Sequence, residues 1–450
     1  MISSNWTKAG HRVESELMSR ENLSKLRAGG LAGSVRVDLS CGLTEFPREI
    51  FDLADTLEIL NLSGNRLSEL PDDLARLKKL RILFCSENEF TRLPAVLGDC
   101  PELEMVGFKA NRIETVDEAA FPCKLRWLIL TDNRIGKLPG SIGRCVRLQK
   151  LMLSGNYLSE LPDEMAACVN LELIRLAANR FTEFPKWLFE LQRLSWLGLG
   201  GNPWSEIQEA DETSMVEIDW RHLEISHVLG EGASGVIHHA HWHAEPVAVK
   251  IFKGAVTSDG LPASEMAASL AAGGHENLIR VLGKISNHPE DRNGLVMSLI
   301  DPDFTNLAGP PDFDSCTRDI YDDSENFELA QVISMAFGLA SVARQLHGRR
   351  IMHGDFYAHN VLRNREGECL LGDFGAAFIY PEGAGLESIE VRAFGCMLGE
   401  LLERCVAGGE NAFLWDLQKR CVAEAVSGRP GFDEICDELK RLVEPAMDAD

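Results

Sequence analysis

Leu148–Asn156 reads LQKLMLSGN, and this stretch decides the fold of the first half of the chain because its pattern recurs. The same LxxLxLxxN pattern closes at seven asparagines spaced 22 or 23 residues apart: Asn65, Asn88, Asn111, Asn133, Asn156, Asn179 and Asn202. The stretch Val37–Gly42 fits one period earlier, with Gly42 in the asparagine place. A fixed period of this length indicates stacked repeats, since one repeat cannot bury its own leucines.

These blocks resemble the leucine-rich repeat family over residues 35–204. The resemblance implies an α/β solenoid with a curved parallel sheet, in which each repeat contributes one short strand. We expect each asparagine side chain to satisfy backbone groups where the chain leaves the strand. Residues 1–34 are interpreted as an N-terminal cap and residues 205–222 as an acidic linker. The cap would carry one amphipathic helix with Val13, Leu17, Asn22 and Leu26.

The strand positions between the leucines would form the concave face of such a solenoid. They are mainly apolar: Ile59, Ile82, Phe84, Met105, Trp127, Ile129, Lys150, Met152, Leu173 and Trp196. If they face solvent, they form an apolar stripe, which favours a protein partner on this face. The alternative is that strands select bulky residues in any case.

The second half carries four motifs in a fixed order: Gly230-Glu231-Gly232-Ala233-Ser234-Gly235, Val247-Ala248-Val249-Lys250, His353-Gly354-Asp355 with Asn360, and Asp373-Phe374-Gly375. Residues that favour β-structure flank the glycines, whereas a dinucleotide site would need a helix after them. Together the motifs resemble the protein kinase family over residues 223–445. The resemblance implies an α+β bilobal domain that binds ATP and Mg²⁺.

The resemblance also implies which residues bind ATP. Backbone amides of the glycine-rich segment would approach the phosphates, because glycine leaves no Cβ in the way. Lys250 would contact the α and β phosphates and pair with Glu265, fifteen residues further on. The remaining ATP-binding positions would surround the adenine, by packing or through backbone groups: Ile237, Ala248, Met297, Ser298, Ile300 and Leu362.

The resemblance also implies the catalytic residues, which are Asp355, Lys250 and Glu265. Asp355 would orient the acceptor hydroxyl and take its proton. Asn360 and Asp373 would hold the magnesium ions. This division suits phosphoryl transfer, in which positioning and charge neutralisation supply most of the rate.

Several positions depart from the family pattern. Gly354 replaces the arginine before the catalytic aspartate, and Tyr357 replaces the lysine expected two residues after it in serine/threonine enzymes. Ordering of the activation segment by phosphorylation is therefore not expected. The segment after Gly375 is short, with Glu382 in a remnant of the Ala-Pro-Glu motif and Arg429 resembling its usual partner. The peptide-docking platform is thus abbreviated.

The motifs favour an ATP-dependent protein kinase that acts on serine or threonine rather than tyrosine. One alternative is a pseudokinase scaffold that binds ATP without turnover. Another is a small-molecule phosphotransferase, since enzymes resembling aminoglycoside and choline kinases share His-Gly-Asp. Those enzymes lack the GxGxxG, VAVK and Asp-Phe-Gly details found here.

The composition of the chain indicates which classes of partner it can bind and in which compartment we expect it. The net charge of −24 argues against binding nucleic acid, since no basic stripe is available to displace counterions. No stretch approaches the roughly 18–20 apolar residues of a membrane span, and the N-terminus lacks a signal peptide, which predicts a cytoplasmic protein. Twelve cysteines without a CxxC pair indicate free thiols.

Overall fold

The computed structural model describes residues 17–205, 216–232, 234–254, 256–257, 259–406 and 411–447. The chain divides into two compact units, residues 1–171 and 172–450. The division falls inside the repeats, so the last of them belong to the second unit.

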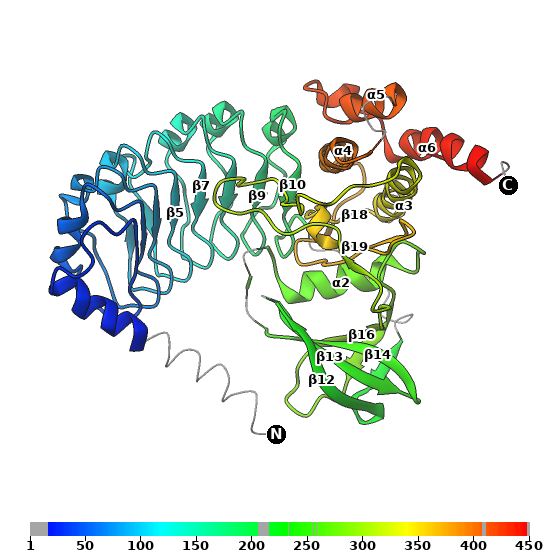
Figure 1. The fold of residues 1–450 in the computed structure, drawn as a ribbon, viewed down its shortest axis with the longest axis horizontal. Coiled ribbons are helices and arrows are strands. Elements are labelled where there is room, and N and C mark those ends of the chain that lie inside the picture. Colours follow the sequence, from blue (N-terminus) through cyan, green and yellow to red (C-terminus); the bar gives the residue numbers. More distant parts are fainter. Residues whose placement is uncertain are drawn as a thin grey trace. The chain divides into compact units, whose positions relative to one another are not determined.

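The first unit is built on short parallel strands that pair with their neighbours in chain order (Figure 1). Equivalent repeat positions are in register, as Ile59 and Ile82 show. The strands are β1 (Arg36–Asp38), β2 (Ile59–Asn61), β3 (Ile82–Phe84), β5 (Met105–Gly107), β7 (Trp127–Ile129) and β8 (Lys150–Met152). The predicted parallel sheet of the repeats is confirmed.

Short 3₁₀ helices follow the Leu-Pro and Phe-Pro steps, because proline fixes its own backbone and cannot donate to a strand ladder. They are η1 (Arg48–Leu53), η2 (Leu74–Arg76), η3 (Ala95–Asp99), η4 (Gly140–Arg144) and η5 (Asp163–Ala167). Strand β4 (Arg92–Leu93) pairs in parallel with β6 (Thr115–Val116). Residues 17–27 are helical, with Leu26 buried and Leu17 exposed, whereas Val13 lies outside the described residues.

The asparagines form the predicted backbone-satisfying ladder. The side-chain amide of Asn133 donates to the carbonyls of Phe108 (2.9 Å) and Leu130 (3.0 Å). Its oxygen accepts from the backbone N–H of Ile113 at 3.0 Å. Asn133 thus ties its own turn to the preceding repeat, which explains why an asparagine recurs in phase along the chain.

The second unit begins with residues 172–205, here named the terminal repeats. They contain the parallel strands β9 (Leu173–Arg175) and β10 (Trp196–Gly198), with η6 (Lys186–Glu190) between them. A mixed sheet follows, in the order β11 (Glu217–Asp219), β15 (Val281–Ser286), β16 (Gly294–Ser298), β14 (Glu245–Phe252), β13 (Gly235–Trp242) and β12 (Leu223–Glu231). Strand β11 lies in the range that the sequence assigns to the linker.

Helix α2 (Pro262–Ala272) accompanies this sheet, and further helices form the other lobe of the second unit (Figure 1). They are α3 (Leu329–Gly348), α4 (Glu387–Glu403), α5 (Ala412–Cys421) and α6 (Phe432–Met447). Short helices are η8 (Trp220–His222), η9 (Ala358–Asn360) and η11 (Val426–Gly428). Short strands are β17 (Thr305–Asn306), β18 (Ile351–Met352), β19 (Val361–Arg363), β20 (Cys369–Leu371) and β21 (Phe378–Ile379). The predicted α+β architecture with a sheet lobe and a helical lobe is confirmed.

The apolar strand positions differ in exposure: Ile82, Met105 and Met152 are at most 8% exposed, whereas Ile59, Phe84, Trp127 and Ile129 are partly exposed. Two expectations need correction. Arg429 does not pair with Glu382 but donates to backbone carbonyls. Among the described residues one helix, α3, is long and apolar enough to cross a bilayer, so the expectation that no stretch approaches this composition is wrong. Half of its apolar window is buried, as in a core helix.

Candidate active site

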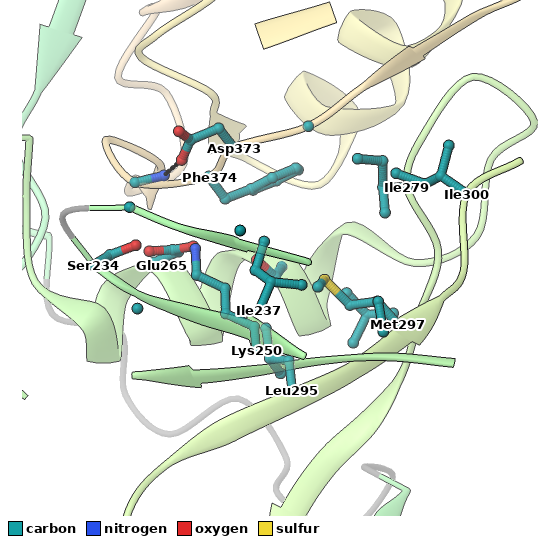
Figure 2. A pocket seen from close by; sticks show the side chains of 18 of the residues that line it. Ser234, Ile237, Lys250, Glu265, Ile279, Leu295, Met297, Ile300, Asp373 and Phe374 are labelled. Carbon is teal, nitrogen blue, oxygen red and sulfur yellow. Dashed lines mark hydrogen bonds and ion pairs between the residues drawn. The ribbon is translucent and has the colours of Figure 1, made fainter. Parts of the chain in front are cut away.

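A cavity of about 550 Å³ lies where most of the predicted ATP-binding residues meet (Figure 2). The predicted residues that line it are Gly230, Gly232, Ser234, Gly235, Ile237, Ala248, Lys250, Glu265, Met297, Ser298, Ile300, Leu362 and Asp373. Glu231 does not line it, and its carboxylate pairs instead with Lys253 at 2.9 Å. Ala233 lies outside the described residues.

Other residues line the cavity that were not singled out from the sequence. Part of the apolar lining comes from Leu229, Val281 and Leu295. Phe374 lines the cavity next to Asp373. Leu229 and Phe374 adjoin recognised motifs, so their proximity could have been anticipated. Thr257 and Asp259 come from the segment between β14 and α2, which carries no motif.

The glycine-rich hairpin has both open space and close packing at its glycines. A Cβ at Gly230 or Gly232 would meet nothing within 4 Å, whereas one at Gly235 would lie 2.6 Å from the Ile251 carbonyl oxygen. Gly235 therefore lets β13 approach β14 closely at the point where Lys250 faces the cavity. This leaves room beside the backbone for a bulky anionic ligand such as a triphosphate.

Lys250 on β14 and Glu265 on α2 form an ion pair inside this cavity. Both side chains are largely buried, at 11% and 4% exposure. Burial raises the pKa of the Glu265 carboxyl, although the Lys250 ammonium pulls it in the opposite direction. A buried pair of this kind fixes the position of the ammonium, which can then meet phosphate oxygens without reorganising.

Asp355 and Asn360 lie together on the loop around η9, outside the lining of the cavity. The Asn360 amide donates to the Asp355 carboxylate and to its backbone carbonyl, each at 2.9 Å. The buried carboxylate of Glu390 on α4 accepts from the backbone N–H of Gly354 at 2.8 Å. The loop is thus held from both sides, so the orientation of Asp355 is determined.

Asp373 and Asn360 come from neighbouring backbone segments, since the Gly372 N–H donates to the Asn360 carbonyl at 2.9 Å. Asp373 has a φ of +47°, in the left-handed region, where a non-glycine residue is strained. One of its carboxylate oxygens accepts from the Gly375 N–H at 3.1 Å. Carboxylate and amide oxygens are the donors that Mg²⁺ takes in proteins, so these residues fit that ion.

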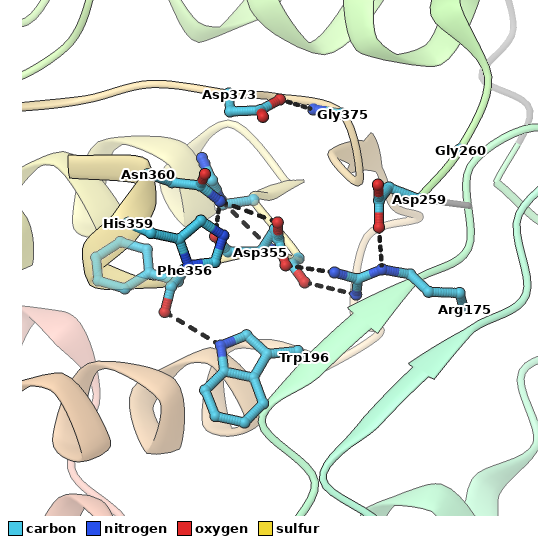
Figure 3. A network of polar contacts seen from close by, with 12 residues as sticks. Arg175, Trp196, Asp259, Gly260, Asp355, Phe356, His359, Asn360, Asp373 and Gly375 are labelled. Carbon is cyan, nitrogen blue, oxygen red and sulfur yellow. Dashed lines mark hydrogen bonds and ion pairs between the residues drawn. The ribbon is translucent and has the colours of Figure 1, made fainter. Parts of the chain in front are cut away.

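Arg175 is a site residue that sequence reasoning missed. This side chain from β9 is 1% exposed and forms an ion pair with Asp355 (Figure 3). Burial raises the pKa of the Asp355 carboxyl, but the charges of Arg175 and the nearby histidines outweigh it and hold the pKa below its ordinary value. No local pattern marks Arg175, because it occupies an ordinary variable position of a repeat.

Comparisons with known proteins agree with this architecture. Residues 223–383 match the family described as protein tyrosine and serine/threonine kinase. Residues 123–181 and 146–203 match one leucine-rich repeat family, and residues 56–77 match another.

Individual relatives are distant and cover only parts of the chain. The transforming protein mos of Moloney murine sarcoma virus (strain ts110), a serine/threonine-protein kinase, is 26% identical over 36% of this chain and 46% of its own length. A Dictyostelium discoideum protein described as probable inactive serine/threonine-protein kinase roco10 is 34% identical over 25% of this chain and 4% of its own length. A solved leucine-rich repeat protein of Leptospira interrogans is 32% identical over 37% of this chain and 43% of its own, with a TM-score of 0.36. The chain therefore spans less than half the length of these relatives.

Proposed function

We propose that this chain, which combines leucine-rich repeats with a protein tyrosine and serine/threonine kinase domain, transfers the γ-phosphate of ATP to serine or threonine hydroxyls of protein substrates. The observation that carries the proposal is the meeting of Lys250, Glu265 and Asp373 in one cavity under the glycine-rich hairpin. A dinucleotide or purely structural domain has no need for an ion pair and a strained carboxylate at the same cavity.

In this proposal each residue of the site has a specific role in binding ATP or in phosphate transfer. The backbone of residues 230–235 and the Lys250 ammonium bind the phosphates, and Glu265 keeps Lys250 in place. Asp373 and Asn360 would hold Mg²⁺, which would neutralise charge on the phosphates. The acceptor hydroxyl gives its proton to Asp355 while its oxygen bonds to the γ-phosphorus, and the bond from that phosphorus to the β–γ bridging oxygen breaks to release ADP.

A scaffold that binds ATP without turnover is the second candidate. It is favoured by the ion pair of Arg175 with Asp355, because the guanidinium already occupies one oxygen of the carboxylate that would take the proton. The relative described as a probable inactive kinase points in the same direction.

For the remaining repeats we propose recognition of a protein partner, and for the whole chain a place in the cytoplasm. The repeat families support the first, since stacked repeats present extended surfaces to partners. The kinase family supports the second, because ATP and reduced thiols belong to that compartment. Burial of much of the apolar strand surface shifts the expected contacts toward its polar and partly exposed positions.

The test is transfer of radiolabelled phosphate from ATP in the presence of Mg²⁺, using the full chain with protein and small-molecule acceptors in parallel. Label on protein that falls at least about 100-fold in both Lys250→Met and Asp373→Asn supports the protein kinase. Label only on a small molecule would assign the metabolite-directed alternative. ATP binding without transfer to any acceptor would refute the enzyme and leave the scaffold.

A further inference from the structure

The catalytic loop lacks two cationic side chains that protein kinases have at the corresponding positions. Gly354 stands where the family has arginine, and Tyr357 stands where serine/threonine enzymes have lysine. Among the described residues, the guanidinium that contacts this loop at Asp355 comes from the terminal repeats. Nη1 of Arg175 donates to the Gly354 carbonyl at 2.9 Å, and Nη2 donates to the Asp355 carboxylate.

The second strand of the terminal repeats contacts the same loop. The indole N–H of Trp196 donates to the Phe356 carbonyl at 3.1 Å (Figure 3). The Trp196 ring stacks on Tyr357 with centroids 4.0 Å apart and planes 6° from parallel. Stacked aromatic pairs are stabilised beyond the effect of the area they bury. Tyr357 therefore adds a stacking contact between the loop and the repeats.

Glycine at position 354 is explained by this contact. A Cβ there would lie 2.4 Å from the Leu197 carbonyl oxygen and 2.9 Å from that of Ala376. Within the repeats, Gly198 makes room for Arg175, since a Cβ at Gly198 would lie 3.0 Å from Cδ of Arg175. An arginine at 354 could not coexist with β10 in this place. The glycine at position 354 is therefore what allows β10 to pack against the catalytic loop.

Contacts outside the loop are those of a permanent interface rather than a removable lid. The Gln192 carbonyl accepts from Arg392 (2.9 Å) and Arg429 (2.7 Å), both 9% exposed. The buried carboxylate of Glu172 pairs with Arg318 at 3.1 Å. Separation would break the Glu172–Arg318 ion pair and remove both donors from the Gln192 carbonyl.

We propose that Arg175 is a positioning residue for phosphoryl transfer, supplied by the terminal repeats in place of the cations that the catalytic loop lacks. This inference rests on the proposed function. Arg175 binds one carboxylate oxygen of Asp355 and Asn360 binds the other, so the plane of the carboxylate is fixed. Each oxygen has two lone pairs, which leaves acceptor capacity for a substrate hydroxyl. The terminal repeats are then part of the kinase active site.

The test compares Arg175→Ala, Arg175→Lys and the control Arg193→Ala in the full chain, by kcat and by KM for ATP. Arg193 belongs to the same repeats and is exposed. We expect kcat to fall roughly 10- to 100-fold in Arg175→Ala, as for loss of hydrogen bonds to a charged group, with KM for ATP within twofold. Arg175→Lys should recover part of the loss, and Arg193→Ala should equal the parent. Unchanged or increased kcat in Arg175→Ala would overturn the inference, an increase showing that the guanidinium blocks the acceptor.

Folding and turnover are separated by two further measurements. Removal of Arg175 leaves Asp259 and Asp355 facing each other, so Arg175→Ala is also made with Asp259→Asn, which should improve folding without restoring kcat. Hydrogen exchange of peptides covering residues 353–361 should rise at least severalfold in the Arg175 variants and not in Arg193→Ala. If the parent chain transfers no phosphate, the proposed function fails, and this exchange still decides whether Arg175 holds the loop; unchanged exchange refutes that role.

Discussion

Alanine at Gly354 tests whether the β10 backbone lies against the catalytic loop. Gly354 has a φ of +73°, and its Cβ would overlap the Leu197 carbonyl oxygen at 2.4 Å. Gly383 is a matched control, since its φ is +77° and a Cβ there would meet nothing within 4 Å. Both variants place a side chain in the left-handed region, and only Gly354→Ala also brings its Cβ against the Leu197 carbonyl oxygen.

The expected magnitudes follow from these two terms. A side chain in the left-handed region costs about 1–2 kcal/mol, which both variants incur. Forcing an extra methyl group into a packed contact costs about 1–3 kcal/mol, which only Gly354→Ala incurs. At roughly 2 °C per kcal/mol for a domain of this size, Gly354→Ala should melt about 2–6 °C below Gly383→Ala.

The assay is thermal unfolding of the full chain, followed by tryptophan fluorescence because Trp196 stacks on the same loop. Gly354→Arg is included as a third variant. Comparison with the family predicts that it restores a missing cation, whereas the structure predicts a larger loss of stability than for alanine. Equal melting of Gly354→Ala and Gly383→Ala, or stabilisation by arginine, would refute the close packing of Leu197 on this loop.

Two further predictions concern stability elsewhere in the chain. Asn133→Ala should lower the free energy of unfolding by roughly 3 kcal/mol or more, because it leaves buried backbone groups unpaired. Asn170→Ala removes only a solvent-exposed hydrogen bond to the Val146 carbonyl and should cost less than about 1 kcal/mol; equal urea midpoints would contradict the ladder. Burial and the nearby Asp319 raise the pKa of Glu400 to about 7, so the native state keeps a proton that the unfolded chain loses above its ordinary value of 4.5. Stability should therefore fall as pH rises from about 5 to 8, by at most about 1.4 kcal/mol per pH unit. Glu400→Gln should flatten this dependence in urea unfolding measured across that range, and an unchanged slope would exclude Glu400 as its source.

Much of the cavity could be anticipated because its residues belong to motifs with local geometry. A hairpin after paired β-forming segments places Gly230 and Gly235 over Lys250, and helical periodicity places Glu265 on one face of α2. Register in a sheet and phase on a helix are set by neighbours in the chain, so spacing carries this information. Roles for these residues stay predictions until transfer is measured.

Contacts between distant segments could not be anticipated in the same way. Asp259 reaches the cavity from a segment without a recognisable pattern. The exposure of the apolar strand positions could not be read from the sequence either, because alternation along a strand says which side chains share a face and not what covers that face.

From the sequence alone, the repeat, the kinase-type architecture and most of the residues that line the cavity could be predicted. Each of these follows from periodicity or short-range spacing, which act through neighbouring residues. Only the tertiary structure decided that Arg175 meets Asp355, 180 residues away, and that Gly354 makes room for Leu197. Such pairings depend on how two surfaces fit, and shape complementarity between surfaces leaves no period or spacing in the chain.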